Sequence, residues 1–114
     1  MLLKDKTIHK VNGIGREQER DICKFLQGCV YCWCNNHPNQ WFSARDFLGR
    51  DNCYWEETPL MPLYEKHKSK ATAVKDAGKD AGWLLKKVIL EDKRTFNTKT
   101  EQLIRQYKWV GNEI

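Results

Sequence analysis

Apolar residues recur at helical spacing over a long segment near the start of the chain. From about Arg16 to Asn35, side chains three and four residues apart form one apolar stripe, as in an amphipathic α-helix. The stripe consists of Ile22, Phe25, Leu26, Cys29, Val30 and Trp33. Acidic residues in the first turn suit the positive end of the helix dipole. The sequence therefore predicts a first long helix here.

A second long helix is predicted to end near Leu90 and to begin as early as Thr72. With about 100° of rotation per residue, its apolar positions gather on one side. This core face holds Ala81, Leu84, Leu85 and Val88, with Ile89 at its edge. The opposite, outward face holds Lys79, Trp83, Lys86, Lys87, Leu90 and Arg94. We expect one side of this helix to cover the core and the other to be exposed and basic.

Shorter elements are predicted between the two long helices. Trp41 and Phe42 are strand-like, and Ser43 is a good N-cap for a short helix over Ala44–Leu48. A further helix is expected near Pro59–His67, because proline is favoured in the first turn of a helix.

The segment Arg94–Val110 is interpreted as two strands around a turn at Thr98–Glu101. Together with the helices, it predicts an α+β fold that is mainly α. We expect three or four helices followed by a C-terminal β-hairpin.

The N-terminal residues 1–15 are predicted to lie outside this domain, as either an arm or a strand. A strand over residues 2–11 would have Ile8 and Val11 inside. Residues 16–114 are predicted to form a single domain, because 114 residues suffice for one hydrophobic core and not for two.

Composition places the chain among ordinary soluble proteins, with 40% apolar and 31% charged residues. No apolar run is long enough for a signal peptide or a membrane span. The five cysteines are an odd number, which favours free thiols in a reducing compartment. We therefore expect a cytoplasmic protein that has no membrane partner.

Positive charge is concentrated in the C-terminal part of the chain. Residues 1–65 carry 8 Lys and Arg against 9 Asp and Glu, whereas residues 66–114 carry 12 against 6. The net charges are therefore −1 and +6. A basic surface suggests a polyanionic partner, because neutralising phosphates releases condensed counterions. Outward lysines are equally typical of any solvated helix.

The order of the elements resembles the winged helix-turn-helix superfamily of DNA-binding proteins. A long first helix, a short strand-like segment, a second and a third helix and a two-stranded ribbon follow one another over roughly residues 16–110. About thirty residues separate Leu48 from Lys79, where the superfamily usually has a tight turn. The resemblance implies that Lys79–Leu90 is the recognition helix and Arg94–Val110 the wing.

These patterns predict a small, non-enzymatic protein that binds double-stranded DNA. It would act as a transcriptional regulator or a replication accessory factor of a bacterium or a mobile element. We expect the third helix and the wing to contact phosphates. The candidate DNA-binding residues are Lys79, Lys86, Lys87, Arg94, Lys99, Arg105 and Lys108. The sequence carries no signal for a DNA sequence preference or an oligomeric state.

Trp83 and Leu90 suggest a second function on the same scaffold. They lie seven residues apart on the outward face and form an apolar ridge, which is typical of protein interfaces. The chain would then be a protein-interaction or inhibitor module. In a purely structural interpretation, the wing or residues 50–68 fold over both side chains, which then belong to the core.

Metal and catalytic sites are not predicted. Cys29, Cys32, Cys34 and His37 lie near one another in the sequence, Cys53 follows, and Cys-x2-Cys is a usual half-site for zinc. A zinc-stabilised binding domain is therefore a third hypothesis. Within a helix, however, these thiols point in different directions. The histidines are scattered over different predicted elements, and we expect no cofactor, no metal ligand and no catalytic residue.

Overall fold

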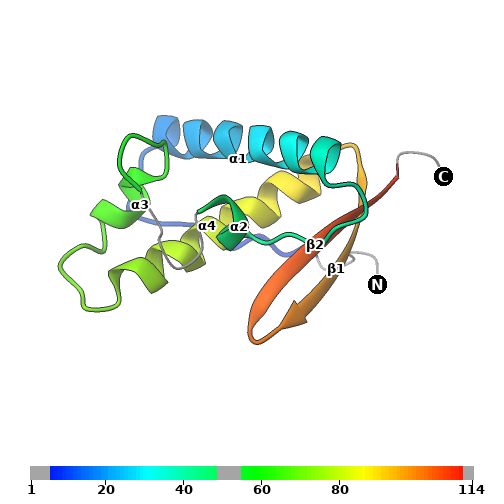
Figure 1. Ribbon diagram of the computed structural model, residues 1–114. Helices are drawn as coiled ribbons and strands as arrows, with labels where there is room; N and C mark the ends of the chain where they lie inside the picture. Colours follow the sequence, from blue (N-terminus) through cyan, green and yellow to red (C-terminus); the bar gives the residue numbers. More distant parts are fainter. Residues whose placement is uncertain (1–5, 49–54, 112–114) are drawn as a thin grey trace.

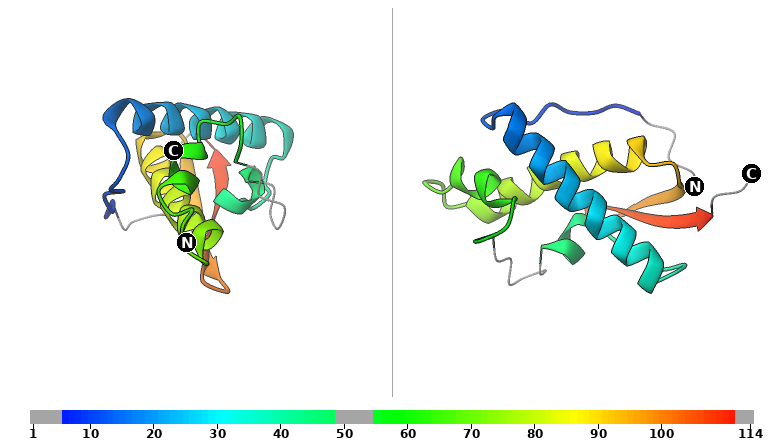
Figure 2. Two further views of the ribbon diagram at one scale, coloured as in Figure 1. Left: turned by 90° about the vertical axis from the view of Figure 1, so that its left-hand side faces the viewer. Right: turned by 90° about the horizontal axis from the view of Figure 1, so that it is seen from above.

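The computed structural model describes residues 6–48 and 55–111, and two long helices form its framework (Figure 1). α1 spans Arg16–Asn36 and α4 spans Ala73–Glu91. α1 lies in a layer over α4, and the two helices cross (Figure 2). Both predicted long helices are confirmed, with ends that lie within one residue of the expected positions.

The core lies where α1 and α4 cross. α1 buries four residues spaced four apart, which form one row within the core cluster: Ile22, Leu26, Val30 and Cys34. Phe25, Cys29 and Trp33, which complete the predicted stripe, are half-buried at its edge. The predicted core face of α4 is confirmed, since Ala81, Leu84, Leu85, Val88 and Ile89 are all buried. Each fully buried Leu or Ile contributes about 1.5–3 kcal/mol, so these two rows supply much of the stability.

Two short helices connect α1 to α4. α2 spans Ala44–Phe47, and the backbone N–H of Ser43 donates a hydrogen bond of 2.8 Å to the Asp46 carboxylate. The predicted helix start at Ser43 is therefore confirmed. α3 spans only Met61–Glu65, within the longer helix that was expected, and is followed by turns.

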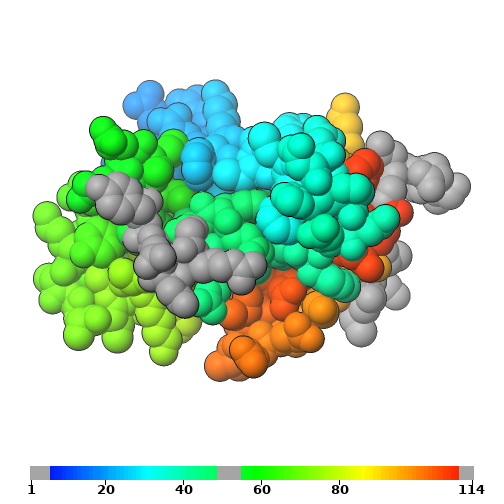
Figure 3. Space-filling model, in the orientation of Figure 1, coloured from blue at the N-terminus to red at the C-terminus, as the bar shows by residue number. Residues whose placement is uncertain are grey.

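The chain ends in an antiparallel hairpin of β1 (Thr95–Glu101) and β2 (Ile104–Gly111). In the space-filling view the hairpin forms part of the lower edge of the molecule (Figure 3). The turn residues are Gln102 and Leu103, so the predicted turn at Thr98–Glu101 is wrong. The register explains the difference, because Phe96 pairs with Trp109 and Thr98 with Tyr107. Cross-strand packing of aromatic side chains therefore outweighs the local turn preference of polar residues.

A single β-bridge joins the hairpin to the segment between α1 and α2. Phe42 pairs with Tyr107 through two backbone hydrogen bonds of 2.8 Å. Its ring also lies 6.2 Å from the Phe96 ring and 6.0 Å from the Tyr107 ring, measured between centroids. The expected strand-like character of Trp41–Phe42 is confirmed at Phe42, which fixes the base of the hairpin to the core.

Residues 6–15 form an arm and not a strand. Val11 is buried as expected, whereas Ile8 is 45% exposed, so the two side chains do not share an inward face. Residues 2–5 of the predicted strand lie outside the described residues. The strand prediction is wrong over residues 6–11, because no neighbouring strand within the described ranges supplies its backbone partners.

The described elements are thus four helices followed by a C-terminal hairpin. This is the mainly helical α+β fold that the sequence predicts.

Candidate nucleic-acid interface

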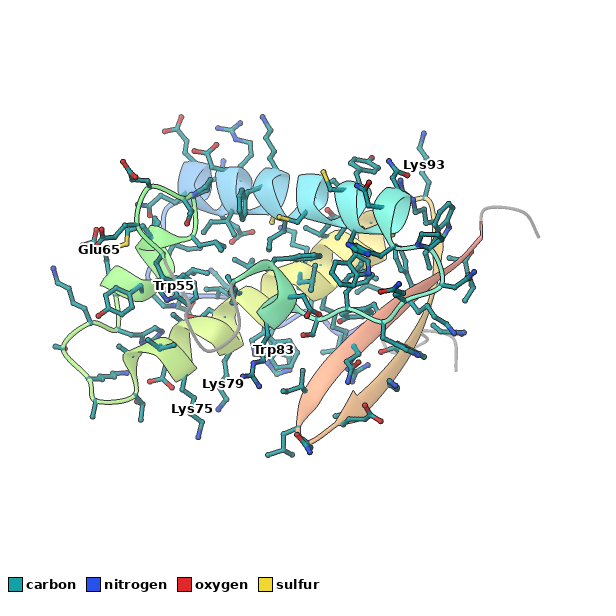
Figure 4. All side chains as sticks on the ribbon, viewed as in Figure 1. Trp55, Glu65, Lys75, Lys79, Trp83 and Lys93 are labelled. Atoms are coloured by element: carbon teal, nitrogen blue, oxygen red, sulfur yellow. The ribbon has the colours of Figure 1, made fainter. Side chains whose placement is uncertain are left out.

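The N-terminal half of α4 exposes a row of side chains on the side of the molecule toward which the hairpin extends (Figure 4). Lys75, Lys79 and Trp83 lie four residues apart and therefore one above another on the helix. Both lysines are exposed, and their Cα atoms are separated by about 6 Å along the helix axis. We call residues 73–83 the open half of α4.

The C-terminal half of α4, residues 84–91, is covered on the same side. Lys86 is only 4% exposed, and its Nζ lies 5.9 Å from the centroid of the Trp83 ring. The expectation that Lys86 lies on an outward surface is therefore wrong. A helical wheel shows only that the Lys86 side chain points away from the core face of α4. It does not show that other segments of the chain pack on this side of the helix. One of them is the arm, whose His9 ring stacks on Trp83.

Lys87 lies on the flank of α4 that faces α1. Its Nζ donates a hydrogen bond of 2.8 Å to the Glu19 carboxylate, and both side chains are partly exposed. The hydrogen bond to Glu19 raises the pKa of Lys87 above its ordinary value. Lys87 therefore joins the two long helices and does not share the surface of Lys79.

Arg94 stabilises the connection between α4 and the hairpin. Its guanidinium group lies 3.2 Å from the Asp92 carboxylate and stacks on the rings of Tyr31 and Trp109, at 4.5 and 5.4 Å. Asp92 also accepts a hydrogen bond of 2.7 Å from Gln27 of α1. Arg94 is thus held between rings and a carboxylate at the base of the hairpin, away from the open half of α4.

The three predicted cations of the hairpin lie on both of its faces. Lys99 and Lys108 share one face, where their Nζ atoms lie 4.4 and 5.0 Å from the centroid of the Trp41 ring. Arg105 lies on the other face, is exposed, and places a guanidinium nitrogen 3.4 Å from the Thr98 hydroxyl. Lys99, which the sequence places in the turn, lies within β1 and is 3.5 Å from the Glu101 carboxylate.

Sequence reasoning missed cations beside the open half. Lys75 is one helical turn before Lys79, and this spacing was a sufficient signal. Lys6 and Lys10 on the arm are exposed, and the arm reaches α4 at the stacked pair of His9 and Trp83. That contact joins residues 74 positions apart in the sequence, so no local pattern indicates it.

The open half also carries two carboxylates, Asp76 and Asp80, and the Asp80 carboxylate lies 2.8 Å from Lys66 Nζ and 2.9 Å from His67 Nε2. The Thr72 hydroxyl donates a hydrogen bond of 2.8 Å to Asp76, which lowers the pKa of that carboxyl below its ordinary value. Asp76 therefore stays ionised and offsets part of the positive charge of Lys75 and Lys79.

Trp83 is half-buried, as is Leu90. The ring centroids of Trp83 and His9 are 3.8 Å apart, with 23° between the ring planes. The arm covers part of Trp83, and the indole also packs against the core, in line with the structural interpretation. That interpretation expects the wing or residues 50–68 as the cover, and residues 50–54 lie outside the described residues. Trp83 and Leu90 therefore offer only part of the exposed apolar area that the protein-interface alternative assumes.

The cysteines of α1 do not gather into a metal site. Burial raises the pKa of Cys23, Cys29 and Cys34, which favours the neutral thiol over the thiolate that binds metals. Over residues 6–48 and 55–111, no three His, Cys, Asp or Glu side chains converge as metal ligands would. Cys53 lies outside these residues.

No known protein family has a model that matches this chain, and no curated protein or solved structure is significantly similar to it. Within the part of the chain that the structure describes, no helix combines the length and apolar character needed to cross a membrane.

Proposed function

We propose that this chain is a small, non-enzymatic protein that binds double-stranded DNA. The open half of α4 enters the major groove, and the hairpin contacts the flanking backbone. A transcriptional regulator or a replication accessory factor of a bacterium or mobile element would use such a domain. The proposal differs from the sequence prediction in its residues: Lys75 joins the set, and Lys86, Lys87 and Arg94 leave it.

One observation carries this proposal: Lys75, Lys79 and the hairpin lie on the same side of the molecule (Figure 4). A cylinder of about 10–12 Å in diameter with side chains fits the major groove, which is about 12 Å wide. Gly78 and Gly82 flank this row and leave open space in front of the helix backbone, as far as the described residues reach. A phosphate backbone can therefore approach α4 closely.

The layout of the elements supports the same function. α1, the bridge residue Phe42, α2, α4 and the hairpin follow one another in the order of winged helix-turn-helix proteins, and Phe42 pairs with β2. α3 and the segments around it replace the tight turn that usually joins the second and third helices of that superfamily.

The protein-interaction alternative has less support. It relies on the outward side chains of Trp83 and Leu90, and both are half-buried. An interface hot spot needs an apolar anchor that the free protein exposes.

Salt dependence of duplex binding tests the proposal. Phosphate contacts from Lys75, Lys79, Lys99, Arg105 and Lys108 predict that the logarithm of the association constant falls with the logarithm of salt concentration, with a slope of about −4.5. Fluorescence anisotropy of a labelled duplex, measured from 50 to 300 mM salt, gives this slope.

Charge reversal assigns the binding to one side of the molecule. The Lys75→Glu/Lys79→Glu variant should lose at least about 100-fold in duplex affinity, since two attractive contacts become repulsive. The control is Lys24→Glu/Lys93→Glu, which makes the same charge change at exposed positions of α1 and the α4–β1 connection. Lys93 points away from the open half (Figure 4). Equal loss in both variants would show binding through net charge alone and would contradict the proposal.

A further inference from the structure

The tip of the hairpin presents a fully exposed apolar side chain. Leu103 is 98% exposed, more than any other large hydrophobic residue that the structure describes. It lies in the two-residue turn between β1 and β2, next to Gln102. Within residues 6–48 and 55–111, no packing contact requires a leucine here, since its side chain is almost fully exposed.

The backbone conformation of this turn also disfavours a leucine at position 103. Gln102 has a φ of 52° and Leu103 a φ of 67°, both in the left-handed region. Two-residue hairpin turns of this kind favour Asn followed by Gly, because side chains are strained at positive φ. Glycine at position 103 would relieve the strain, so the fold by itself favours a residue other than the one present. Strained residues of this kind cluster at functional sites.

The hairpin places Leu103 far enough from the body of the protein to enter a DNA groove. Thr98 and Tyr107 form the last cross-strand pair in which both side chains are buried. Three further pairs lie between it and the turn, and they extend the hairpin by about 10 Å at 3.3 Å per residue. The minor groove is about 7.5 Å deep, so the tip can reach the base pairs.

The charges behind the tip favour nucleic acid over a protein surface. Lys99 and Arg105 lie two and one cross-strand pairs before the turn-closing pair of Glu101 and Ile104. Glu101 is the opposing charge at the tip; Lys99 at 3.5 Å neutralises it in part, and the Gln106 amide donates a hydrogen bond of 3.1 Å to it. An apolar tip with cations at its base can insert between stacked bases while the cations contact phosphates on either side.

We propose that Leu103 acts as a wedge that inserts between adjacent base pairs from the minor groove and kinks the duplex. Apolar side chains used in this way bend DNA by about 20–90°. The inference rests on the proposed DNA binding and adds a shape-dependent contact to it. It implies a preference for flexible pyrimidine–purine steps and for DNA that is already kinked.

The experiment compares the wild-type chain with two variants at the tip. Leu103→Gly removes the wedge and fits the positive φ, and Leu103→Met keeps an apolar side chain of similar size. Both variants are expected to fold, because the native side chain has almost no contacts with the domain. Each protein is mixed with a duplex of about 30 base pairs, long enough for one domain and one bend. The duplex is labelled at both ends for energy transfer and carries 2-aminopurine at a central TA step.

The wild-type chain and Leu103→Met should raise both the energy transfer and the 2-aminopurine emission, because the duplex bends and the step unstacks. Leu103→Gly should raise neither, and it should bind the intact duplex about tenfold more weakly. On a duplex nicked at the same step, where bending costs little, its affinity should come within about threefold of wild type.

The possible failures are distinct. If the wild-type chain binds the duplex with the salt dependence given above but does not bend it, the wedge is wrong and the DNA-binding proposal stands. Equal bending by wild type and Leu103→Gly also overturns the wedge, because the bend then does not depend on the side chain at position 103. If the wild-type chain does not bind duplex DNA at all, both proposals fail.

Discussion

Lys79 and Lys86 lie seven residues, or two helical turns, apart on the same side of α4, and their environments are opposite. Lys79 is exposed in the open half of the helix, whereas Lys86 is 4% exposed in the covered half. The boundary lies at Trp83, where the arm reaches the helix and His9 stacks on the indole ring. Before Trp83 in the sequence, the outward side of α4 is exposed to solvent. After Trp83, the same side of the helix is buried.

The comparison shows why a basic helix face need not be one binding surface. A lysine at an outward position becomes available to a partner only where no third element packs on it. In α4 this condition holds for Lys75 and Lys79, which are both exposed, and the helix contact with a polyanion that we propose is confined to them. The covered half contributes to the interior instead.

The largest expected effect comes from reversing the charge in each half. Lys86→Glu should destabilise the protein by about 3 kcal/mol, because it places a carboxylate in a buried site where a cation is accommodated. Lys79→Glu, the matched change in the open half, should alter the free energy of unfolding by less than about 0.5 kcal/mol. Urea denaturation followed by circular dichroism measures both. A Lys86→Glu variant as stable as Lys79→Glu would mean that both positions are open to solvent.

The base of the hairpin shares the interior with the covered half of α4, and its titration should reveal this. Burial raises the pKa of Tyr107 from 10.0 to about 12. Between these values the unfolded chain has lost the phenol proton and the folded protein keeps it, so stability falls as pH rises through this window. The loss between pH 10 and 11.5 should be about 1–2 kcal/mol.

Tyr107→Phe is the control for this titration, because it removes the phenol and keeps the ring. The buried thiols of α1 also titrate at high pH, but they do so in both proteins. The difference between the two unfolding free energies should therefore isolate Tyr107. Parallel pH profiles would show that water reaches this side chain and that the hairpin base is not closed.

The sequence predicted those parts of the fold in which local pattern and tertiary packing agree. Both long helices and the core face of α4 followed from periodicity alone. The start of α2 followed from the capping preference of Ser43, whose role depends on residues three positions apart. Each of these features is decided within a few residues of chain, and the information is therefore present in a short window.

The errors occurred where distant segments meet. The turn was predicted at Thr98–Glu101 and lies at Gln102–Leu103, because Phe96 pairs with Trp109 and Thr98 with Tyr107 across the strands. Lys86 became buried and Lys87 became tied to α1, although both have the same residue type and charge as Lys79. A helical wheel of α4 includes only the residues of that helix and says nothing of the arm, α1 or the hairpin. It could therefore assign the candidate lysines to one face but could not determine which of them are accessible to solvent.

The smallest expected effect concerns the two helix glycines of the open half. Gly82→Ala places a methyl group in open space, because no described atom other than those of adjacent residues and the helix's own backbone lies within 4 Å of the new Cβ. It should stabilise the helix by about 0.5–1 kcal/mol, since alanine loses less backbone entropy than glycine on folding. Gly28→Ala in α1 is the matched control, with the same open space around its Cβ and the same expected gain in unfolding free energy.

The two variants should differ in duplex affinity: if the backbone of DNA lies against the open half, Gly82→Ala weakens binding while Gly28→Ala leaves it unchanged. Urea denaturation and anisotropy on the same samples separate the two quantities. If Gly82→Ala stabilises the protein and leaves its DNA affinity unaltered, the hairpin alone contacts DNA. The two halves of α4 would then not differ in DNA binding.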